Sequence, residues 1–148
     1  MIVGIASDHR GFTRKQELIE QLENLEYNVV DYGAYSEVSI DYPDVAFQLG
    51  EAVAKQECDC GIILCQTGIG VSIACNKVKK IRCAKVDTVE EAKMTRLHND
   101  ANIIAMSAKL PLEVAQQITT TFLTTEFSED ERHIRRIEKL TNYEDHLC

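Results

Sequence analysis

The chain has 148 residues, of which 45% are hydrophobic, 27% charged and 6% aromatic. This composition is typical of a folded globular protein and excludes a disordered chain. The length suits one domain, which we assign to residues 1–148. The 24 acidic residues outnumber the 16 Lys and Arg residues, for a net charge of −8. Since a nucleic-acid-binding protein needs a basic face, this balance argues against nucleic acid as a partner.

No stretch approaches the roughly 20 apolar residues of a membrane span. Residues 1–9 carry neither the basic region nor the cleavage signal of a secretory leader. We therefore expect no membrane partner and a cytoplasmic location, where the six cysteines would be thiols. Cys58 and Cys60 form CxC rather than CxxC, and no second pair completes a zinc set, so we expect no metal.

Short runs rich in β-branched residues alternate with segments of helical spacing along the chain. The runs predict strands at 2–5, 27–30, 61–64, 82–86 and 101–106. The spacing of apolar residues predicts helices near 18–25, 45–53, 71–75, 89–97, 112–122 and 128–140, with an irregular loop at 33–43. Strands that alternate with helices form a parallel sheet covered on both faces. We therefore predict a doubly wound α/β fold with a five-stranded parallel sheet and an additional C-terminal helix.

Ligands of such sheets bind beyond the carboxyl ends of the strands. The polar residues that follow the predicted strands are Asp8 and His9, the segment 65–70, and the surroundings of Asp87 and Ser107. These are the positions where we expect chemistry.

The segment 65–70, with the sequence CQTGIG, is the most informative of these. Its two glycines allow successive backbone N–H groups to turn inward and bind an anionic oxygen. The helix that follows adds partial positive charge, which favours a thiolate at Cys65. The competing interpretation is a glycine-rich turn that contains a buried cysteine, and this segment alone does not decide between the two.

Particular residues exclude three other classes of protein. A dinucleotide-binding fold would carry GxGxxG after the first strand, where residues 7–11 read SDHRG. A cysteine-dependent phosphatase would need an arginine six residues after Cys65, where Val71 stands. A receiver domain would place an aspartate at the end of the third strand, where the chain has Cys65.

Two further polar clusters lie in the second half of the chain. His98, Asn99 and Asp100 precede the fifth predicted strand, and the alternative to a binding role is a solvated helix end. Arg132 and Arg136 are four residues apart, so they share one helix face and could grip a phosphate together. Pairing of these arginines with acidic neighbours on the surface is an alternative of equal weight.

Together, five motifs resemble the ribose-5-phosphate isomerase B family, which includes the galactose-6-phosphate isomerase subunits. The motifs lie in order at 7–12, 41–44, 65–77, 98–102 and 132–136. The resemblance implies a Rossmann-like three-layer α/β/α sandwich and a homodimer, or a tetramer, with sites between subunits. It also implies reversible isomerisation of ribose 5-phosphate and ribulose 5-phosphate through an enediolate, without metal or cofactor.

Carried over by position, the resemblance implies a role for each candidate residue. Cys65 resembles the base that moves a proton between C1 and C2, and His98 the residue that assists ring opening. Thr67 and the amides of Gly68, Ile69 and Gly70 resemble the hole for the enediolate oxygen. The implied substrate contacts include Asp8, Lys109 and, across the dimer, Asn99. The implied contacts with the phosphate and the ring oxygen are His9, Arg132, His133 and Arg136.

The chain also departs from the family pattern. One branch has an acidic base at the position of Val71, which cannot take a proton, so Cys65 is the only candidate base here. Gln66 stands where most members have Gly, and Lys109 stands where Arg is common. Residues 86–90 lack a His and an aromatic residue that most members have there. Residues 110–111 replace a turn that contains Gly. These departures concern the identity of the sugar phosphate more than the class of reaction.

Three alternatives to a ribose-5-phosphate isomerase are considered. One is an isomerase of a six-carbon sugar phosphate, such as allose or galactose 6-phosphate. Another is an inactive sugar-phosphate-binding module. The third is a thiol redox protein, which the lack of CxxC disfavours.

Overall fold

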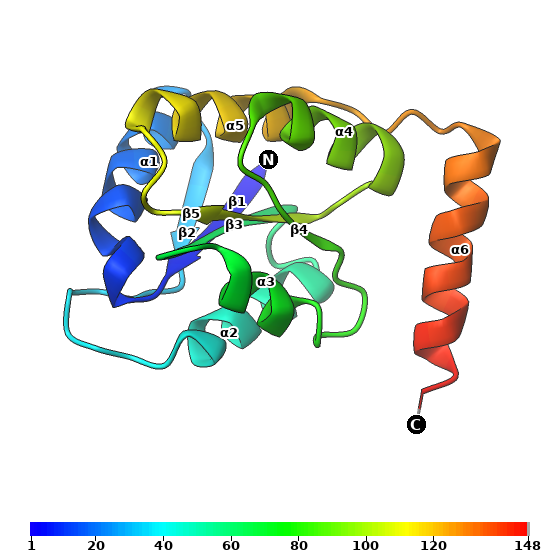
Figure 1. The fold of residues 1–148 in the computed structure, drawn as a ribbon, viewed down its shortest axis with the longest axis horizontal. Coiled ribbons are helices and arrows are strands. Elements are labelled where there is room, and N and C mark those ends of the chain that lie inside the picture. The colour runs from blue at the N-terminus through cyan, green and yellow to red at the C-terminus, as the bar shows by residue number, and fades with distance from the viewer. Residues whose placement is uncertain (148) are drawn as a thin grey trace.

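The computed structural model describes residues 1–147, in which five parallel strands form one sheet (Figure 1). The strands are β1 (Ile2–Ser7), β2 (Asn28–Asp31), β3 (Cys60–Cys65), β4 (Cys83–Lys85) and β5 (Ile103–Ser107). Their spatial order is β2-β1-β3-β5-β4. In the register, Ser7 lies beside Leu64 and Cys65 beside Ser107, so the carboxyl ends of the three central strands are level.

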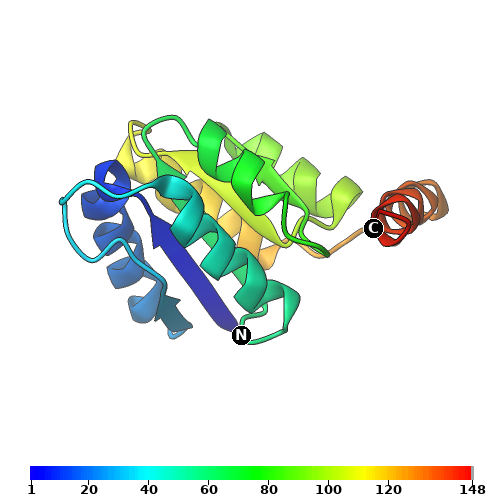
Figure 2. The same cartoon turned by 90° about the horizontal axis from the view of Figure 1, so that it is seen from below.

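Helices cover both faces of the sheet (Figures 1 and 2). One face carries α1 (Phe12–Asn24), α4 (Val89–Asn99) and α5 (Leu112–Thr124), and the other carries α2 (Tyr42–Ala54) and α3 (Ile69–Cys75). Along β3, Ile62 and Leu64 enter one apolar core and Ile63 the other. Because side chains alternate along a strand, such an uninterrupted apolar strand requires cover on both faces. The predicted three-layer α/β/α sandwich is confirmed.

The C-terminal helix α6 (Glu131–Asp145) stands beside the sandwich rather than on a face of the sheet (Figures 1 and 2). Its start was predicted at 128, but the Asp130 side chain accepts the N–H of Arg132 and caps the helix there. The helix also continues beyond the predicted end at 140. Within residues 1–147, no helix combines the length and the apolarity that a membrane crossing needs.

The predicted bounds of all five strands differ from the observed ones by one or two residues. The fifth strand was expected from 101, but β5 begins at Ile103. The side chain of the preceding residue, Asn102, forms hydrogen bonds with the segment that leads into β4. Its amide donates to the carbonyl of Lys80 at 2.9 Å, and its oxygen accepts the N–H of Arg82 at 2.8 Å. Asn102 thus fixes the entry of β4 beside that of β5.

The connections after β1 and β3 diverge at the carboxyl edge of the sheet. The chain leaves β1 toward the edge strand β2, whereas it leaves β3 toward the opposite edge strand, β4. Such a divergence opens a crevice between the two strand ends, and ligands of open parallel sheets bind in it. The residues that follow β1 and β3 therefore lie where a site is expected.

Candidate active site

Asp8 lies in this crevice, directly after β1. The residue is 7% exposed, and its N–H donates to the carbonyl of Leu64, the residue before Cys65, at 3.1 Å. Its carboxylate Oδ1 accepts the N–H groups of Arg10 and Gly11, both at 3.0 Å, in a short 3₁₀ turn (His9–Gly11). These bonds orient the carboxylate beside the end of β3, and within residues 1–147 its Oδ2 has no partner. This oxygen is free to accept a ligand hydroxyl.

Cys65 ends β3, and its thiol contacts the turn that follows. The Sγ atom accepts the N–H of Gly68 at 3.1 Å, and the residue is 6% exposed. This hydrogen bond holds the sulfur against the turn, at the carboxyl end of β3. The glycine-containing turn therefore contacts the sulfur directly and fixes its position.

The turn uses some of its amides itself and leaves others free. Thr67 Oγ1 accepts the N–H of Ile69 at 3.2 Å, and the N–H of Gly68 serves Cys65. Within the described residues, the N–H groups of Gly70 and Val71 have no acceptor, as is usual in the first turn of a helix. Of the three amides that the resemblance implied, that of Gly70 is thus free among the described residues, and the amide of Val71 is a further free donor.

Both glycines of the turn have close neighbours, but only Gly68 is required by the backbone. Gly68 has a φ of +77°, and a Cβ there would lie 2.9 Å from the backbone carbon of Met106. A Cβ on Gly70 would lie 2.8 Å from Cζ of Tyr42. Tyr42 therefore packs its ring against Gly70. Sequence reasoning gave Tyr42 no role, although it belongs to the 41–44 motif.

The segment after β5 braces the same turn. Ser107 Oγ donates to the carbonyl of Gln66 at 2.7 Å, and the N–H of Ala108 donates to the carbonyl of Cys65 at 2.8 Å. Lys109 follows as an exposed cation at this edge. Gln66, where Gly is common in the family, is not among the residues of positive φ, so its side chain introduces no backbone strain.

His9 lies next to Asp8 and is oriented by the loop that precedes α2. The N–H of Ile40 donates to its Nδ1 at 3.2 Å. The carboxyl edge of the sheet thus brings together eight of the candidate residues: Asp8, His9, Cys65, Thr67, Gly68, Ile69, Gly70 and Lys109.

The remaining candidates form a second group around two stacked histidines. His98 in the last turn of α4 and His133 in the first turn of α6 have ring centroids 4.5 Å apart and planes inclined by 18°. Burial lowers the pKa of His133, and the positive charges of His98 and Arg132 lower it further. The neutral imidazole is therefore favoured at this position.

Arg132, Arg136 and Asn99 surround this pair. Arg132 faces Asp130 at 3.5 Å, but its side chain is 60% exposed, so the contact is a weak surface pair that leaves the guanidinium free to bind an anion. Arg136 and Asn99 are exposed as well. Within residues 1–147, the surface pairing considered as an alternative is therefore present only for Arg132, and only weakly.

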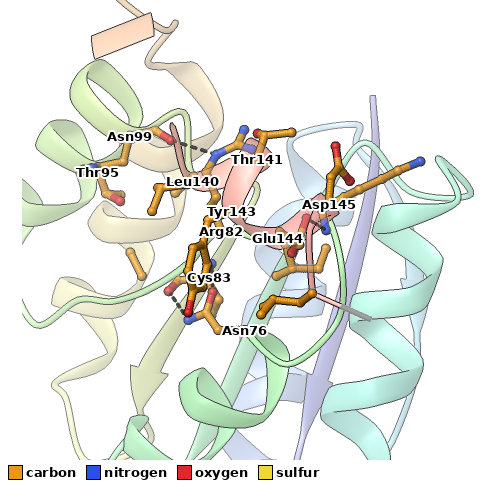
Figure 3. Close-up of a pocket in the computed structure, with 15 residues that line it drawn as sticks. Asn76, Arg82, Cys83, Thr95, Asn99, Leu140, Thr141, Tyr143, Glu144 and Asp145 are labelled. Carbon is orange, nitrogen blue, oxygen red and sulfur yellow. Dashed lines mark hydrogen bonds between the residues drawn. The ribbon is translucent and has the colours of Figure 1, made fainter. Parts of the chain in front are cut away.

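Asp100, another member of the 98–102 motif, has a structural role. Asp100 ends α4 with a φ of 44°, and its carboxylate binds Arg82 at 3.2 Å and Arg96 at 2.8 Å. The Nε of Arg82 also donates to the carbonyl of Asn99 at 2.9 Å (Figure 3). These contacts fix the backbone of Asn99, so that its side chain is presented from a rigid helix end.

The two groups lie at opposite edges of the sheet. Helix α4 returns from the carboxyl edge to the amino edge, so His98 and Asn99 lie near the start of β5, where Ile103 pairs with Gly61. Gly61 precedes Cys65 by four residues, or roughly 13 Å of strand. Within one chain, His98 and Cys65 therefore lie too far apart to act on the same substrate.

A cleft of about 790 Å³ separates α6 from the sandwich (Figure 3). Leu140 and Tyr143 of α6 line one side of it, and Cys83, Thr95 and Asn99 line the other. Sequence reasoning missed this cleft, because it depends on where α6 docks and not on any local pattern.

Three other thiols, those of Cys58, Cys60 and Cys83, are poor nucleophiles. Burial raises the pKa of Cys58, and it raises the pKa of Cys60 to about 12. A hydrogen bond with Cys75, together with burial, raises the pKa of Cys83. Because the thiolate is the reactive form, these residues do not support a thiol redox protein.

A sulfur base beside free amides can move a proton next to a carbonyl while the developing oxyanion is stabilised, which is the chemistry of an aldose–ketose isomerase. Comparison with known proteins agrees. The family model described as Ribose/Galactose Isomerase matches residues 3–140. Ribose-5-phosphate isomerase B of Escherichia coli (strain K12) is 37% identical over 143 residues, which cover 96% of this chain and 95% of that protein. The chain belongs to the ribose/galactose isomerase family, and it is an isomerase.

Solved structures show the same relationship. Ribose-5-phosphate isomerase B of Clostridium thermocellum superposes with a TM-score of 0.97 at 42% identity, covering 100% of both chains. The Mycoplasma genitalium enzyme, solved with bound ribulose-5-phosphate, gives a TM-score of 0.93 at 38% identity and covers 98% of this chain and 97% of that one.

Proposed function

We propose that this isomerase interconverts ribose 5-phosphate and ribulose 5-phosphate, with Cys65 as the base. The observation that carries the proposal is the Gly68 N–H bound to Cys65 Sγ at 3.1 Å, next to the free amides of Gly70 and Val71. The names of the Escherichia coli and Clostridium thermocellum relatives supply the substrate.

The reaction proceeds by proton transfer. The Cys65 thiolate removes the proton from C2 of the open-chain aldose, and the C–H electron pair forms the C1–C2 double bond while the carbonyl oxygen at C1 becomes an oxyanion. The free amides bind this oxyanion. One such donor typically contributes about 3–4 kcal/mol. Return of the proton from the Cys65 thiol to C1, with transfer of the C2 hydroxyl proton to the C1 oxyanion, gives the ketose.

Binding of the sugar involves both edges of the sheet. Asp8 accepts hydrogen bonds from sugar hydroxyls through its free carboxylate oxygen. Opening of the furanose ring needs an acid–base group, and we assign it to His98. Arg132, Arg136 and Lys109 supply positive charge for the phosphate, and His9, His133 and Asn99 supply further contacts.

Because His98 and Cys65 of one chain lie at opposite edges, we assign the complete site to a homodimer. The His98 group of one copy would lie over the Cys65 edge of the other. In a two-fold dimer this exchange is reciprocal and makes two equal sites. No metal or cofactor enters any of these steps.

The test is an assay of the purified protein with ribose 5-phosphate, allose 6-phosphate and galactose 6-phosphate, following ketose formation. We expect the highest kcat/KM with ribose 5-phosphate. Preference for a six-carbon substrate would overturn the assignment of the sugar. Thermal stabilisation by all three compounds without any product would identify an inactive binding module.

A further inference from the structure

Lys15 is a buried cation that belongs to neither group of candidate site residues. It lies in the first turns of α1 and is 0% exposed. Its Nζ donates to Asp31 Oδ1 at 2.5 Å, to Asp31 Oδ2 at 2.7 Å and to the carbonyl of Ala34 at 2.6 Å. A buried ammonium is costly unless its donors are used, and here these acceptors use them. The arrangement therefore fixes Asp31 and Ala34 relative to α1.

Aromatic rings complete the surroundings of Lys15. The ring centroids of Phe12 and Tyr35 lie 5.6 and 5.4 Å from Nζ, within the range of cation–π attraction. Asp31 in turn accepts the N–H of Gly33 at 2.9 Å, and its carbonyl accepts the hydroxyl of Tyr35 at 3.1 Å. The beginning of the loop 33–41 is thus bound to Lys15 directly and through Asp31.

This loop contacts the chain on both sides of Asp8. Before it, the N–H of Ser7 donates to the carbonyl of Gly33 at 2.6 Å, and the N–H of Ala34 donates to the carbonyl of Ser7 at 2.5 Å. After it, Ile40 donates its N–H to Nδ1 of His9 at 3.2 Å. A neutral imidazole that accepts at Nδ1 carries its proton on Nε2. The loop therefore sets both the orientation and the tautomer of His9.

We propose that Lys15 is a positioning residue for the isomerase site: it anchors the loop 33–41, through which Ile40 holds His9 as an Nε2–H donor toward the sugar phosphate. The role of His9 as a substrate contact is part of the proposed function, on which this inference rests. Lys15 touches no substrate and acts only through the loop.

The test compares the double variant Lys15→Met/Asp31→Asn with the unaltered protein. The double variant removes both charges with little change of volume, so neither charge is left buried alone. Lys55→Met is the matched control, because Lys55 forms an exposed pair with Glu51 at 3.4 Å. The readouts are the tautomer of His9, by ¹⁵N NMR of histidine-labelled protein, the kinetic constants with ribose 5-phosphate, and the rate of Cys65 alkylation by iodoacetamide.

We expect the unaltered protein and the control to show His9 as the Nε2–H tautomer. The double variant should fold, show a mixture of tautomers, and lose roughly 10- to 100-fold in kcat/KM, mainly through KM. Cys65 alkylation should be unchanged. A double variant with a single His9 tautomer and unaltered KM overturns the proposal. If the unaltered protein turned over no sugar phosphate, the proposed function would fail, yet the tautomer would still test the anchoring role of Lys15.

Discussion

His133 stacks on His98 at a centroid distance of 4.5 Å, although the two residues come from helices α6 and α4. At the other end of α6, Asp145 pairs with Lys79 at 2.8 Å, and Glu144 accepts the N–H of Lys80 at 2.8 Å. The helix is thus attached at both ends, with the cleft between them. The arginines proposed to bind phosphate are thereby carried on a helix of fixed position, although it stands off from the sandwich.

The histidine stack predicts a pH dependence of stability. Burial and the charges of His98 and Arg132 lower the pKa of His133 in the folded chain. The unfolded chain, with the ordinary pKa of about 6.5, therefore binds this proton more readily. The free energy of unfolding should fall as the pH is lowered through about 6.5 and be regained as it is raised.

Thermal melting of the protein and of His133→Asn between about pH 5.5 and pH 7.5 measures this dependence. The variant should melt at a lower temperature at neutral pH but show a shallower decline on acidification. Equal declines in the two proteins would mean that other groups cause the acid sensitivity.

Replacing the proposed base should greatly reduce turnover without unfolding the chain. Cys65→Ala is expected to lower kcat by roughly 10²–10⁴-fold, the usual contribution of a positioned base. Cys60→Ala is the matched control, because Cys60 begins the same strand at the opposite edge of the sheet. Circular dichroism verifies the fold of both variants. Normal turnover by Cys65→Ala would show that another group removes the proton.

The two glycines of the turn should differ in their tolerance of a side chain. Gly68→Ala forces an alanine into a left-handed backbone and against the backbone of Met106, so we expect a loss of about 2 kcal/mol or more in unfolding free energy. The added methyl of Gly70→Ala meets only the far end of Tyr42, which can move. Denaturant titration should rank Gly68→Ala as the less stable variant. The reverse order would contradict the described turn.

Neighbouring residues at the end of α4 should separate binding from stability. Asn99→Ala should keep the melting temperature but lower kcat/KM, because the exposed amide is assigned only to substrate. Asp100→Ala removes the contacts with Arg82 and Arg96, which are partly exposed, and should cost about 1 kcal/mol of unfolding free energy. Chemical denaturation and steady-state kinetics on both variants check this division. Loss of stability in Asn99→Ala would assign that side chain to the fold instead.

Local patterns were sufficient to predict the sandwich and to select one of the two groups of candidate site residues. The apolar run that became β3 required cover on both faces, and the rule that ligands bind at carboxyl ends of strands singled out Asp8 and Cys65. The separation of His98 from Cys65 follows from the return direction of α4. Docking of α6 onto α4 could not be predicted, because the stack of His98 on His133 involves two polar residues far apart in the chain.

The sequence position of Lys15 indicates that this residue is buried. It lies three residues before Leu18 and seven before Leu22, on the helix face that both leucines bury. A lysine at such a position implies a buried partner. Its identity, Asp31, depends on the pairing of β1 with β2 and is beyond local reasoning.

The sharing of one site between two copies is tested most directly by mixing two inactive variants, Cys65→Ala and His98→Ala. The variants are unfolded together, refolded and assayed with ribose 5-phosphate. Random pairing gives hybrid dimers in which one site has both Cys65 and His98, so activity should return to about a quarter of that of the unaltered protein. If hybrid dimers form and the mixture stays inactive, Cys65 and His98 do not act in one shared site.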